Sequence, residues 1–343
     1  MNNTKFTEYS LIPFTFEALE NGTLTFRDCK DKTNEVLYYK INNLDWVCGN
    51  RPLKLTLKAG DTVAFKGNSK KYKFASNSST IAFTGKYALK GNIMSLVYGD
   101  DFLTNTVIPE ECFGMFAYNQ TNLIDAKDLY IAASEVAKKG CYYMFKGCKN
   151  LKSTPKLLAN TLGASAYCGM FWLCTSLTEA PELPAMNLGE GCYMSMFNIC
   201  SSLVKAPELP ATNLKHMCYE TMFNKCTSLV KAQDILPAKE LKSYCYREMF
   251  QNCTNLEKAP ILPAEGFYPW GWCYTYMFKG CTKLNYIKAM FVSFPAGKKT
   301  WLVNWVEGVS EKGTFVRNKN SKWSVKEFRG TSGVPVNWNV EIE

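Results

Sequence analysis

The sequence is poor in the residues that build catalytic and metal sites. It contains one histidine, His216, among 343 residues. Zinc sites usually combine clustered cysteine and histidine ligands, and general acid–base catalysis uses histidine most often. The chain also lacks a glycine-rich phosphate-binding motif and a Ser/His/Asp constellation. We therefore expect a protein that is not an enzyme, with no catalytic residues, no cofactor and no metal.

Long apolar runs are missing as well. No window approaches the roughly 20 apolar residues that a membrane span needs. The start, MNNTKFTEYSLIPFTFEALE, has no apolar core of the kind found in secretory signals, because Pro13 and three glutamates interrupt it. We expect no membrane insertion and no export, so that the protein is made and assembled in the cytoplasm. Cysteines stay thiols in such a reducing compartment.

The charge is moderately basic, with 40 Lys and Arg against 30 Asp and Glu, a net charge of +10. Residues 1–96 hold much of the excess, with 14 basic against 8 acidic residues. A nucleic-acid-binding protein more often shows a basic stripe interleaved with aromatic residues, so we expect no nucleic-acid partner. We interpret the lysine-rich stretch 66–74 as a solvated loop; the alternative is a contact with a polyanion such as an acidic polysaccharide.

Internal repetition dominates the sequence. The pair Met-Phe recurs seven times, at intervals of 29, 26, 26, 26, 27 and 28 residues. An eighth, degenerate copy follows at residues 301–310, where Trp301 and Trp305 replace the cysteine and the methionine. A terminal copy that departs from the consensus is typical of a capping unit. We predict a solenoid of about seven units of 26–29 residues over 97–295, closed by a C-terminal cap over 296–343.

Each repeat has one apolar face. Cys192, Tyr193, Met196, Phe197 and Cys200 fall within an arc of about 140° if the segment is helical. A segment near 203–206 reads as a short strand, and a proline-bounded turn follows it. The predicted fold class is therefore mixed α/β, a leucine-rich-repeat solenoid with a short strand and a short helix in each unit.

The first 96 residues follow a different pattern. Apolar and polar residues alternate on both sides of the turn dipeptide Asn21-Gly22, and the alternation returns in three later segments. This pattern predicts a small all-β domain over 1–96, most simply a sandwich. We expect it to cover the open first end of the solenoid and to serve as a docking domain.

Fifteen cysteines invite several explanations. Cys192 and Cys200 would lie about 12 Å apart along a helix, and equivalent cysteines on neighbouring helices about 8–10 Å apart, both too far for a disulfide. The Cys-x7-Cys spacing suits no zinc site, and no histidine accompanies the repeated cysteines as a base. Cysteine behaves as a small buried hydrophobe, so we interpret these residues as core thiols.

The repeat MFKGCKNLKSTPKLLA (144–159) resembles the leucine-rich repeats of BspA-type surface proteins of gut Bacteroidales and related proteins of their phages. The stretches FTFEALENGTLTF (14–26), GNIMSLVYGDDF (91–102) and GVPVNWNV (333–340) resemble the non-repeat ends of those proteins. The resemblance implies adhesion or receptor recognition at a bacterial surface, through a surface glycan or protein.

The missing export signal favours a phage particle protein among these relatives. We expect a fibre or tail component of a virion that is assembled in the host cytoplasm. Its N-terminal domain is expected to dock on other virion proteins, and the protein forms a homo-oligomer if its assembly requires one. The alternatives are a BspA-type adhesin on the bacterial cell surface and a structural decoration protein of the virion without a receptor role.

Binding residues are expected where the repeats differ. Phe267, Tyr268, Trp270 and Trp272 cluster in a longer unit, and Trp172 stands where other repeats have Lys, Asn or Gln. Aromatic side chains suit sugar rings and protein hot spots, so these five are our candidate ligand-contacting residues. The alternative is that they pack against the next turn or the C-terminal cap.

Overall fold

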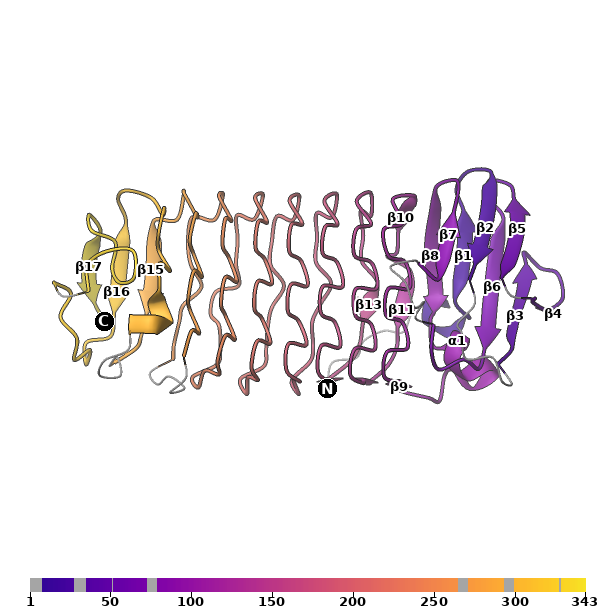
Figure 1. Ribbon diagram of the computed structural model, residues 1–343, viewed down its shortest axis with the longest axis horizontal. Helices are drawn as coiled ribbons and strands as arrows, with labels where there is room; N and C mark the ends of the chain where they lie inside the picture. Colours follow the sequence, from indigo (N-terminus) through magenta and orange to yellow (C-terminus); the bar gives the residue numbers. More distant parts are fainter. Residues whose placement is uncertain are drawn as a thin grey trace.

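The computed structural model describes residues 8–27, 35–50, 52–72, 79–264, 271–292, 299–326 and 328–343. These residues form an elongated stack of coils, with a β-sheet region at its N-terminal end and a smaller three-stranded sheet at its C-terminal end (Figure 1). The chain advances along the long axis of the stack, so each coil has the preceding and the following coil as its neighbours.

Backbone hydrogen bonds join consecutive coils. In the segment 192–200, the N–H groups of Tyr193, Ser195 and Phe197 donate to carbonyls of the following coil at 2.9–3.0 Å. The N–H groups between them donate within the coil to the carbonyl three residues earlier, as Met196 does to Tyr193 at 3.1 Å. Each coil is thus both a series of tight turns and one member of a parallel ladder. The spacing of such ladders is about 4.8 Å.

The short helix predicted for each repeat is wrong. A helix closes bonds between residues four apart and satisfies its N–H groups within one segment. Here every fourth residue adopts a left-handed conformation, as at Gly191 (φ +57°), Ser195 (+57°) and Ile199 (+62°), and this stops a helix from forming. Turns that repeat every four residues point the same side chains inwards as a short helix would. The apolar pattern alone therefore agreed with both structures.

The ladder fixes the register of eight coils. Left-handed residues occupy the equivalent positions Met115, Tyr143, Gly169, Ser195, Thr221, Glu248, Tyr276 and Asn304. The register confirms the predicted repeat from Met144 onwards. It also confirms the degenerate last copy, because the Phe278 N–H donates to the Trp305 carbonyl in the same way that the Phe250 N–H donates to the Met277 carbonyl. The first copy needs a correction. Met115 is equivalent to Tyr143 and not to Met144, so the first interval is 28 residues.

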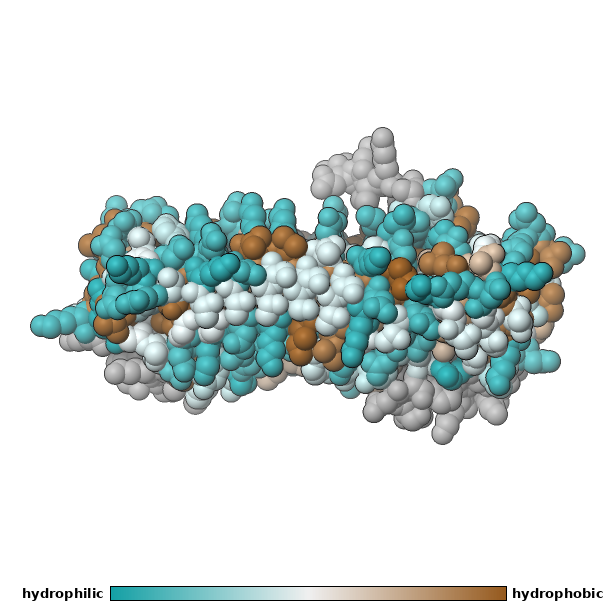
Figure 2. All heavy atoms as spheres, turned by 90° about the horizontal axis from the view of Figure 1, so that it is seen from above, coloured by the Kyte–Doolittle hydropathy of each residue, from teal (hydrophilic) through white to brown (hydrophobic). Residues whose placement is uncertain are grey.

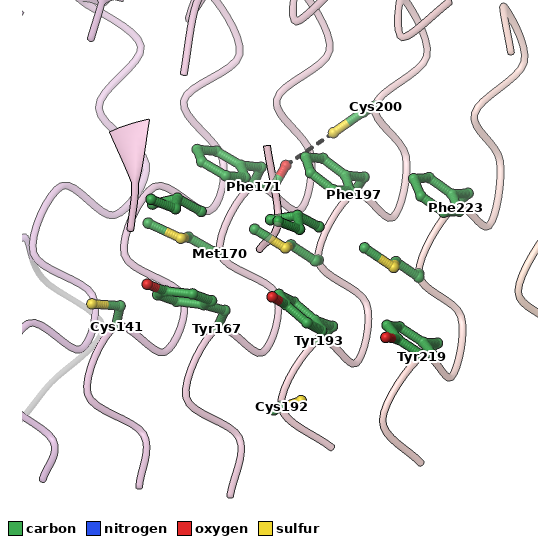
Figure 3. Close-up of a cluster of buried hydrophobic side chains, with 14 of the residues drawn as sticks. Cys141, Tyr167, Met170, Phe171, Cys192, Tyr193, Phe197, Cys200, Tyr219 and Phe223 are labelled. Carbon is green, nitrogen blue, oxygen red and sulfur yellow. Dashed lines mark hydrogen bonds between the residues drawn. The ribbon is translucent and has the colours of Figure 1, made fainter. Parts of the chain in front are cut away.

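Equivalent side chains form columns inside the stack (Figure 3). Neighbouring rings of the phenylalanine column lie 5.5–5.8 Å apart at interplanar angles of 2–12°. From Tyr193 to Tyr274, the tyrosine column has spacings of 5.7–6.0 Å. Cys141 takes the tyrosine position in its coil, in line with Tyr167. The predicted apolar face is therefore confirmed as the core, although a different backbone carries it.

The repeated cysteines pack within these columns. Fourteen cysteines are described as free thiols, and all except Cys48 are buried. The thiol of Cys200 donates to the carbonyl of Phe171 in the preceding coil at 3.1 Å, and five other repeats have the same bond at 2.9–3.2 Å. The prediction of core thiols is confirmed. The separation expected from helix packing is wrong, because equivalent cysteines follow the closer spacing of the ladder.

Two sheets precede the coils; their N-terminal strands pair antiparallel, and one sheet continues into the coils through parallel strands. Phe16 contacts Phe83 of the other sheet at 5.0 Å between ring centroids, and Phe26 contacts Phe65 at 5.1 Å, so the sheets share an aromatic layer. The assignment of a sandwich and the three domain boundaries stay predictions. The strands are β1 (Thr15–Ala18), β6 (Thr62–Gly67), β3 (Leu37–Ile41), β4 (Val47–Cys48) and β8 (Tyr87–Asn92) in one sheet, and β5 (Leu53–Leu57), β2 (Gly22–Phe26) and β7 (Ile81–Phe83) in the other.

Strand β8 connects these sheets to the solenoid. It pairs antiparallel with β1 and parallel with two strands of the coils, β10 (Leu123–Asp125) and β11 (Leu129–Ile131). Tyr72 stacks on Phe113 at 5.6 Å and Phe14 contacts Phe116 at 5.6 Å. These two phenylalanines replace the smaller Cys141 and Met144 of the next coil. The N-terminal sheets therefore pack against the first coil, and the first repeat differs because it packs against them.

Regular secondary structure is sparse in the coils. The strand predicted near 203–206 is reduced to single parallel bridges from Lys205 to Glu179 and Lys231. The remaining elements are the 3-10 turns Glu8–Leu11, Gly99–Asp101 and Lys299–Leu302, the helix α1 (Ser95–Tyr98), and the strands β9 (Val107–Ile108), β10 (Leu123–Asp125), β11 (Leu129–Ile131), β12 (Glu135–Val136), β13 (Lys156–Leu157) and β14 (Thr161–Leu162).

Tryptophans close the last coil. The buried indoles of Trp305, Trp323 and Trp338 donate to the carbonyls of Gly333, Phe291 and Ser310 at 2.7, 3.1 and 2.8 Å. They bury a large apolar area and bond the irregular backbone at this end of the stack. A parallel sheet of β15 (Tyr286–Ala289), β16 (Thr314–Arg317) and β17 (Asn339–Ile342) completes the C-terminal part.

Removal of one buried hydroxyl should stabilise the stack. The hydroxyl of Tyr193 is buried and has no hydrogen-bond partner among the described residues. A buried polar group without a partner costs about 1–3 kcal/mol, so Tyr193→Phe should raise the urea midpoint of unfolding. Tyr98→Phe is the matched control and should lower it, because the Tyr98 hydroxyl donates to the Val107 carbonyl at 2.7 Å. A lower midpoint for Tyr193→Phe would contradict this account.

Candidate functional site

One surface of the solenoid changes from coil to coil while the core below it repeats. We define the variable face as three columns of residues in the turn segments, most of them at least partly exposed. The first column contains Tyr118, Lys146, Trp172, Asn198, Asn224, Gln251, Lys279 and Glu307, and the second contains the eight left-handed residues from Met115 to Asn304. The third column contains the left-handed residues Glu111, Lys139, Ser165, Gly191, Met217, Tyr244 and Trp272. Repeat proteins bind partners through positions of this kind. The variable face is therefore the candidate site.

Aromatic rings surround a lysine near the N-terminal end of this face. The ammonium of Lys146 lies 3.7 Å from the ring centroid of Trp172, 4.3 Å from that of Tyr143 and 5.9 Å from that of Tyr118. Burial among these rings lowers the pKa of Lys146. Cation–π attraction holds its ammonium among the rings. The cluster therefore presents a fixed positive charge framed by aromatic surface.

Trp172 keeps its place as a candidate, but its neighbours were missed. The indole is half-buried and meets Tyr143 edge-on at 5.8 Å. Gly169 makes this contact possible, because a Cβ there would lie 2.2 Å from the Tyr143 ring. The repeat spacing already aligned Lys146 with Trp172, but the close stacking of adjacent coils is what brings their side chains into contact. Tyr118 joins the cluster only through the corrected alignment of the first copy.

A second aromatic cluster lies nearer the C-terminal end. Trp272 is 37% exposed and stacks on Tyr244 with ring centroids 6.4 Å apart at an angle of 10°. Arg247 lies 5.6 Å from the Tyr244 ring and forms ion pairs with Glu220 (3.2 Å) and Glu248 (2.8 Å). Burial raises the pKa of Glu220, and Arg247 opposes this shift. Trp272 thus stands at an exposed position beside ordered charges. The other three residues of the predicted cluster, Phe267, Tyr268 and Trp270, lie outside the described residues.

A groove of mixed charge runs across two coils elsewhere on the solenoid. It encloses 880 Å³ between the proline-bounded segments 178–184 and 204–210. Glu182, Lys205 and Glu208 contribute charge to its lining. Seen along the edge that is uppermost in Figure 1, the surface is mainly hydrophilic or intermediate, and its apolar residues form small separate groups (Figure 2). A partner of this surface would meet polar groups and isolated apolar contacts.

The repeat cysteines are poor candidates for chemistry. Burial raises the pKa of Cys148, Cys218 and Cys281 from the ordinary 9.0 to about 12. A cysteine attacks or binds metal as the thiolate, and these thiols stay protonated at neutral pH. Within the described ranges, no three Cys, His, Asp or Glu side chains gather as a set of metal ligands. In the same part of the chain, every helix is too short or too polar to span a membrane.

Comparison with known proteins gives one solved structure. The chain is similar to a leucine-rich repeat protein from Bacteroides ovatus, with 15% sequence identity, a TM-score of 0.28, and coverage of 80% of this chain and 88% of that one. No protein-family model and no curated protein matches the sequence. The solenoid architecture described above rests on the backbone ladder.

Stability should fall at alkaline pH. A thiol whose pKa is 9.0 when unfolded and about 12 when folded contributes its full stability below pH 9, and this is lost as the pH rises from 9 to 12. The loss is about 1.4 kcal/mol per pH unit for each such thiol. Cys281→Ala should therefore flatten the fall in urea midpoint above pH 9, whereas the exposed Cys48→Ala should not. Equal slopes for the two variants would refute the argument.

Thiol modification gives a direct count. In the folded protein at pH 8, iodoacetamide should label Cys48 and spare the buried Cys200. Denaturation without a reducing agent should make all fifteen cysteines of the chain titratable. Peptide mass spectrometry distinguishes the positions, and a denatured count well below fifteen would mean that disulfides form in solution.

Proposed function

We propose that the protein is a non-enzymatic attachment module that binds a glycan or protein at a bacterial surface through its variable face. The observation that carries the proposal is the contrast between constant core columns and changing outward residues on the same turns. A purely structural stack needs no such variation along one surface. The leucine-rich solenoid supports a binding role of this kind, although solenoids host many partners.

The chemistry of the variable face suits sugars or protein hot spots. Trp172 and Trp272 offer aromatic surface beside the ordered charges of Lys146 and Arg247. Half-buried aromatics of this kind bind with little loss of side-chain entropy, because their neighbours already hold them. The positive charge of the first cluster favours a ligand that carries carboxylate or phosphate groups.

We further propose that this module is a fibre or tail component of a phage particle that infects gut Bacteroidales. The resemblance of residues 144–159 to BspA-type repeats supports the host range. The buried free thiols favour assembly in a reducing compartment over export. In this arrangement the N-terminal sheets contact other virion proteins, and the solenoid faces the host. A cell-surface adhesin and a decoration protein without a receptor remain the competing proposals.

Binding to intact cells tests the proposal. The labelled full-length protein should bind some Bacteroidales strains and not others, according to their capsules. Trp172→Ala and Trp272→Ala should each weaken binding about thirtyfold or more, because truncation of a hot-spot aromatic costs about 2 kcal/mol or more. Tyr286→Ala is the matched control. Its ring also pairs with a lysine, at 5.0 Å from Lys258, but on the β15 strand outside the variable face.

The outcomes separate the three roles. Equal losses for Trp172→Ala and Tyr286→Ala would refute the variable face as the binding site. Absence of binding to every strain would favour a decoration role, and recovery from washed outer membranes in place of particles would favour an adhesin. Point variants are preferable to a truncation at residue 97, because β8 bonds directly to β10 and β11 and its removal would expose the first coil.

A further inference from the structure

A separate pocket lies in the N-terminal sheets, outside the variable face. It encloses 710 Å³ and has both aromatic and charged walls. The aromatic walls are Tyr38, Trp46 and Tyr98, and the charged side chains are Lys66, Lys70 and Asp100. The pocket therefore combines ring surfaces with ammonium and carboxylate groups in one enclosure.

Strand alternation builds the floor of this pocket. In β6, Phe65 points into the aromatic core and Lys66 points outwards. Lys66 is directly opposite Tyr38 on β3, so both side chains share the outer face of the sheet. The interpretation of residues 66–74 as a solvated loop is wrong at Lys66, which belongs to β6 and has a side chain only 18% exposed.

The Lys66 ammonium is held in a defined position. It lies 2.9 and 3.1 Å from the two carboxylate oxygens of Asp100, and 4.6 Å from the ring centroid of Trp46. Lys40 approaches the same indole at 5.3 Å. The pocket lining thus contains two ammonium groups, those of Lys66 and Lys70, and one carboxylate, that of Asp100, which is 86% exposed. The local excess of positive charge favours an anionic ligand.

Gly67 allows the charged partners to meet. A Cβ at this position would lie 2.9 Å from the Val36 carbonyl oxygen and 3.0 Å from that of Leu96. Only glycine therefore lets α1 pack this closely against β6 and β3. The close packing places Asp100, which follows α1, beside Lys66. The arrangement depends on the fold and is not a chance meeting of flexible surface side chains.

We propose that this pocket binds a uronic-acid unit of an acidic polysaccharide. The C–H face of a sugar ring packs on the aromatic walls, its carboxylate pairs with the ammonium groups of Lys66 and Lys70, and its hydroxyls donate to Asp100. An acidic peptide would also pair with the ammonium groups. It would make less use of Asp100, which suits the hydroxyl groups of a sugar, and of the three aromatic walls, which suit the face of a sugar ring. The inference goes beyond attachment through the solenoid, since the variable face takes no part in it.

Titration of the full-length protein with defined oligosaccharides tests the proposal. Oligogalacturonate should bind, uncharged malto-oligosaccharide of the same length should bind at least tenfold more weakly, and added NaCl should weaken the uronate complex. Trp46→Ala and Lys66→Gln should each reduce affinity about tenfold or more. Trp46→Phe should retain most of the affinity, because it keeps an aromatic wall. Urea midpoints show whether each variant is folded.

Lys86→Gln is the matched control for charge. It removes one ammonium from the same region, where Lys86 pairs with Glu20 at 2.6 Å outside the pocket. Unchanged affinity of Lys86→Gln for oligogalacturonate supports a specific site. A loss of affinity equal to that of Lys66→Gln would overturn the proposal, because it would mean that the ligand is held by general electrostatic attraction. Absence of oligogalacturonate binding, or equally tight binding of poly-glutamate, would also overturn the proposal. Purified sugars keep this result independent of whether the solenoid binds cells.

Discussion

The hydrogen bonds between coils are the constraint on which the rest of the structure depends. Tyr193, Ser195 and Phe197 each donate to the next coil, and the same bonds recur from the first coil to the last. Because they join equivalent residues, they place every side chain directly beside its counterpart one repeat later. Over most of the stack, phenylalanines then stack on phenylalanines and tyrosines on tyrosines at 5.5–6.0 Å. The repetition in the sequence is the chemical consequence of this geometry.

The ladder also explains the choice of cysteine. Left-handed residues at every fourth position cost of order 1–2 kcal/mol each, and the bonds between coils offset this cost. Such turns bring carbonyls into the interior, where each must find donors. The Phe171 carbonyl accepts the N–H of Cys174 and the thiol of Cys200. Alanine would fill less space and offer no donor, and serine would place a more strongly hydrated group in the core. Cysteine is small, apolar and still able to donate.

Much of the fold could be predicted from the sequence, and the exceptions have physical causes. The repeat, its core face, the thiols and the tryptophans of the last coil follow from spacing and burial preference. The predicted helix was wrong because the apolar residues Cys192, Met196 and Cys200 recur every four residues. Both a short helix and a series of four-residue turns would place side chains with that period on one face. Met115 and Phe116 were misaligned because Phe116 packs against the N-terminal sheets and not against a repeat. At the candidate sites, the repeat spacing aligned Lys146 with Trp172, but their contact depends on the ladder that stacks adjacent coils, which the helix prediction did not include. The pocket at Lys66 needed the pairing of two strands that are far apart in the sequence.

The two ends of the stack show where unique chemistry can arise in such a protein. Within the ladder, every inward position is set by its neighbours, so variation is confined to side chains on the outer surface. A partner therefore meets a surface that changes gradually over several coils, and the groove between segments 178–184 and 204–210 is lined by equivalent parts of two neighbouring coils. At the two ends of the stack, residues such as Tyr72 and Trp305 cover the exposed backbone of the terminal coils. The sequence there does not repeat, so its side chains need not match a neighbouring coil. The pocket at Trp46 and Lys66 lies in one of these non-repeating parts. An extended binding surface along the coils and a compact site in the N-terminal sheets are thus two consequences of one architecture.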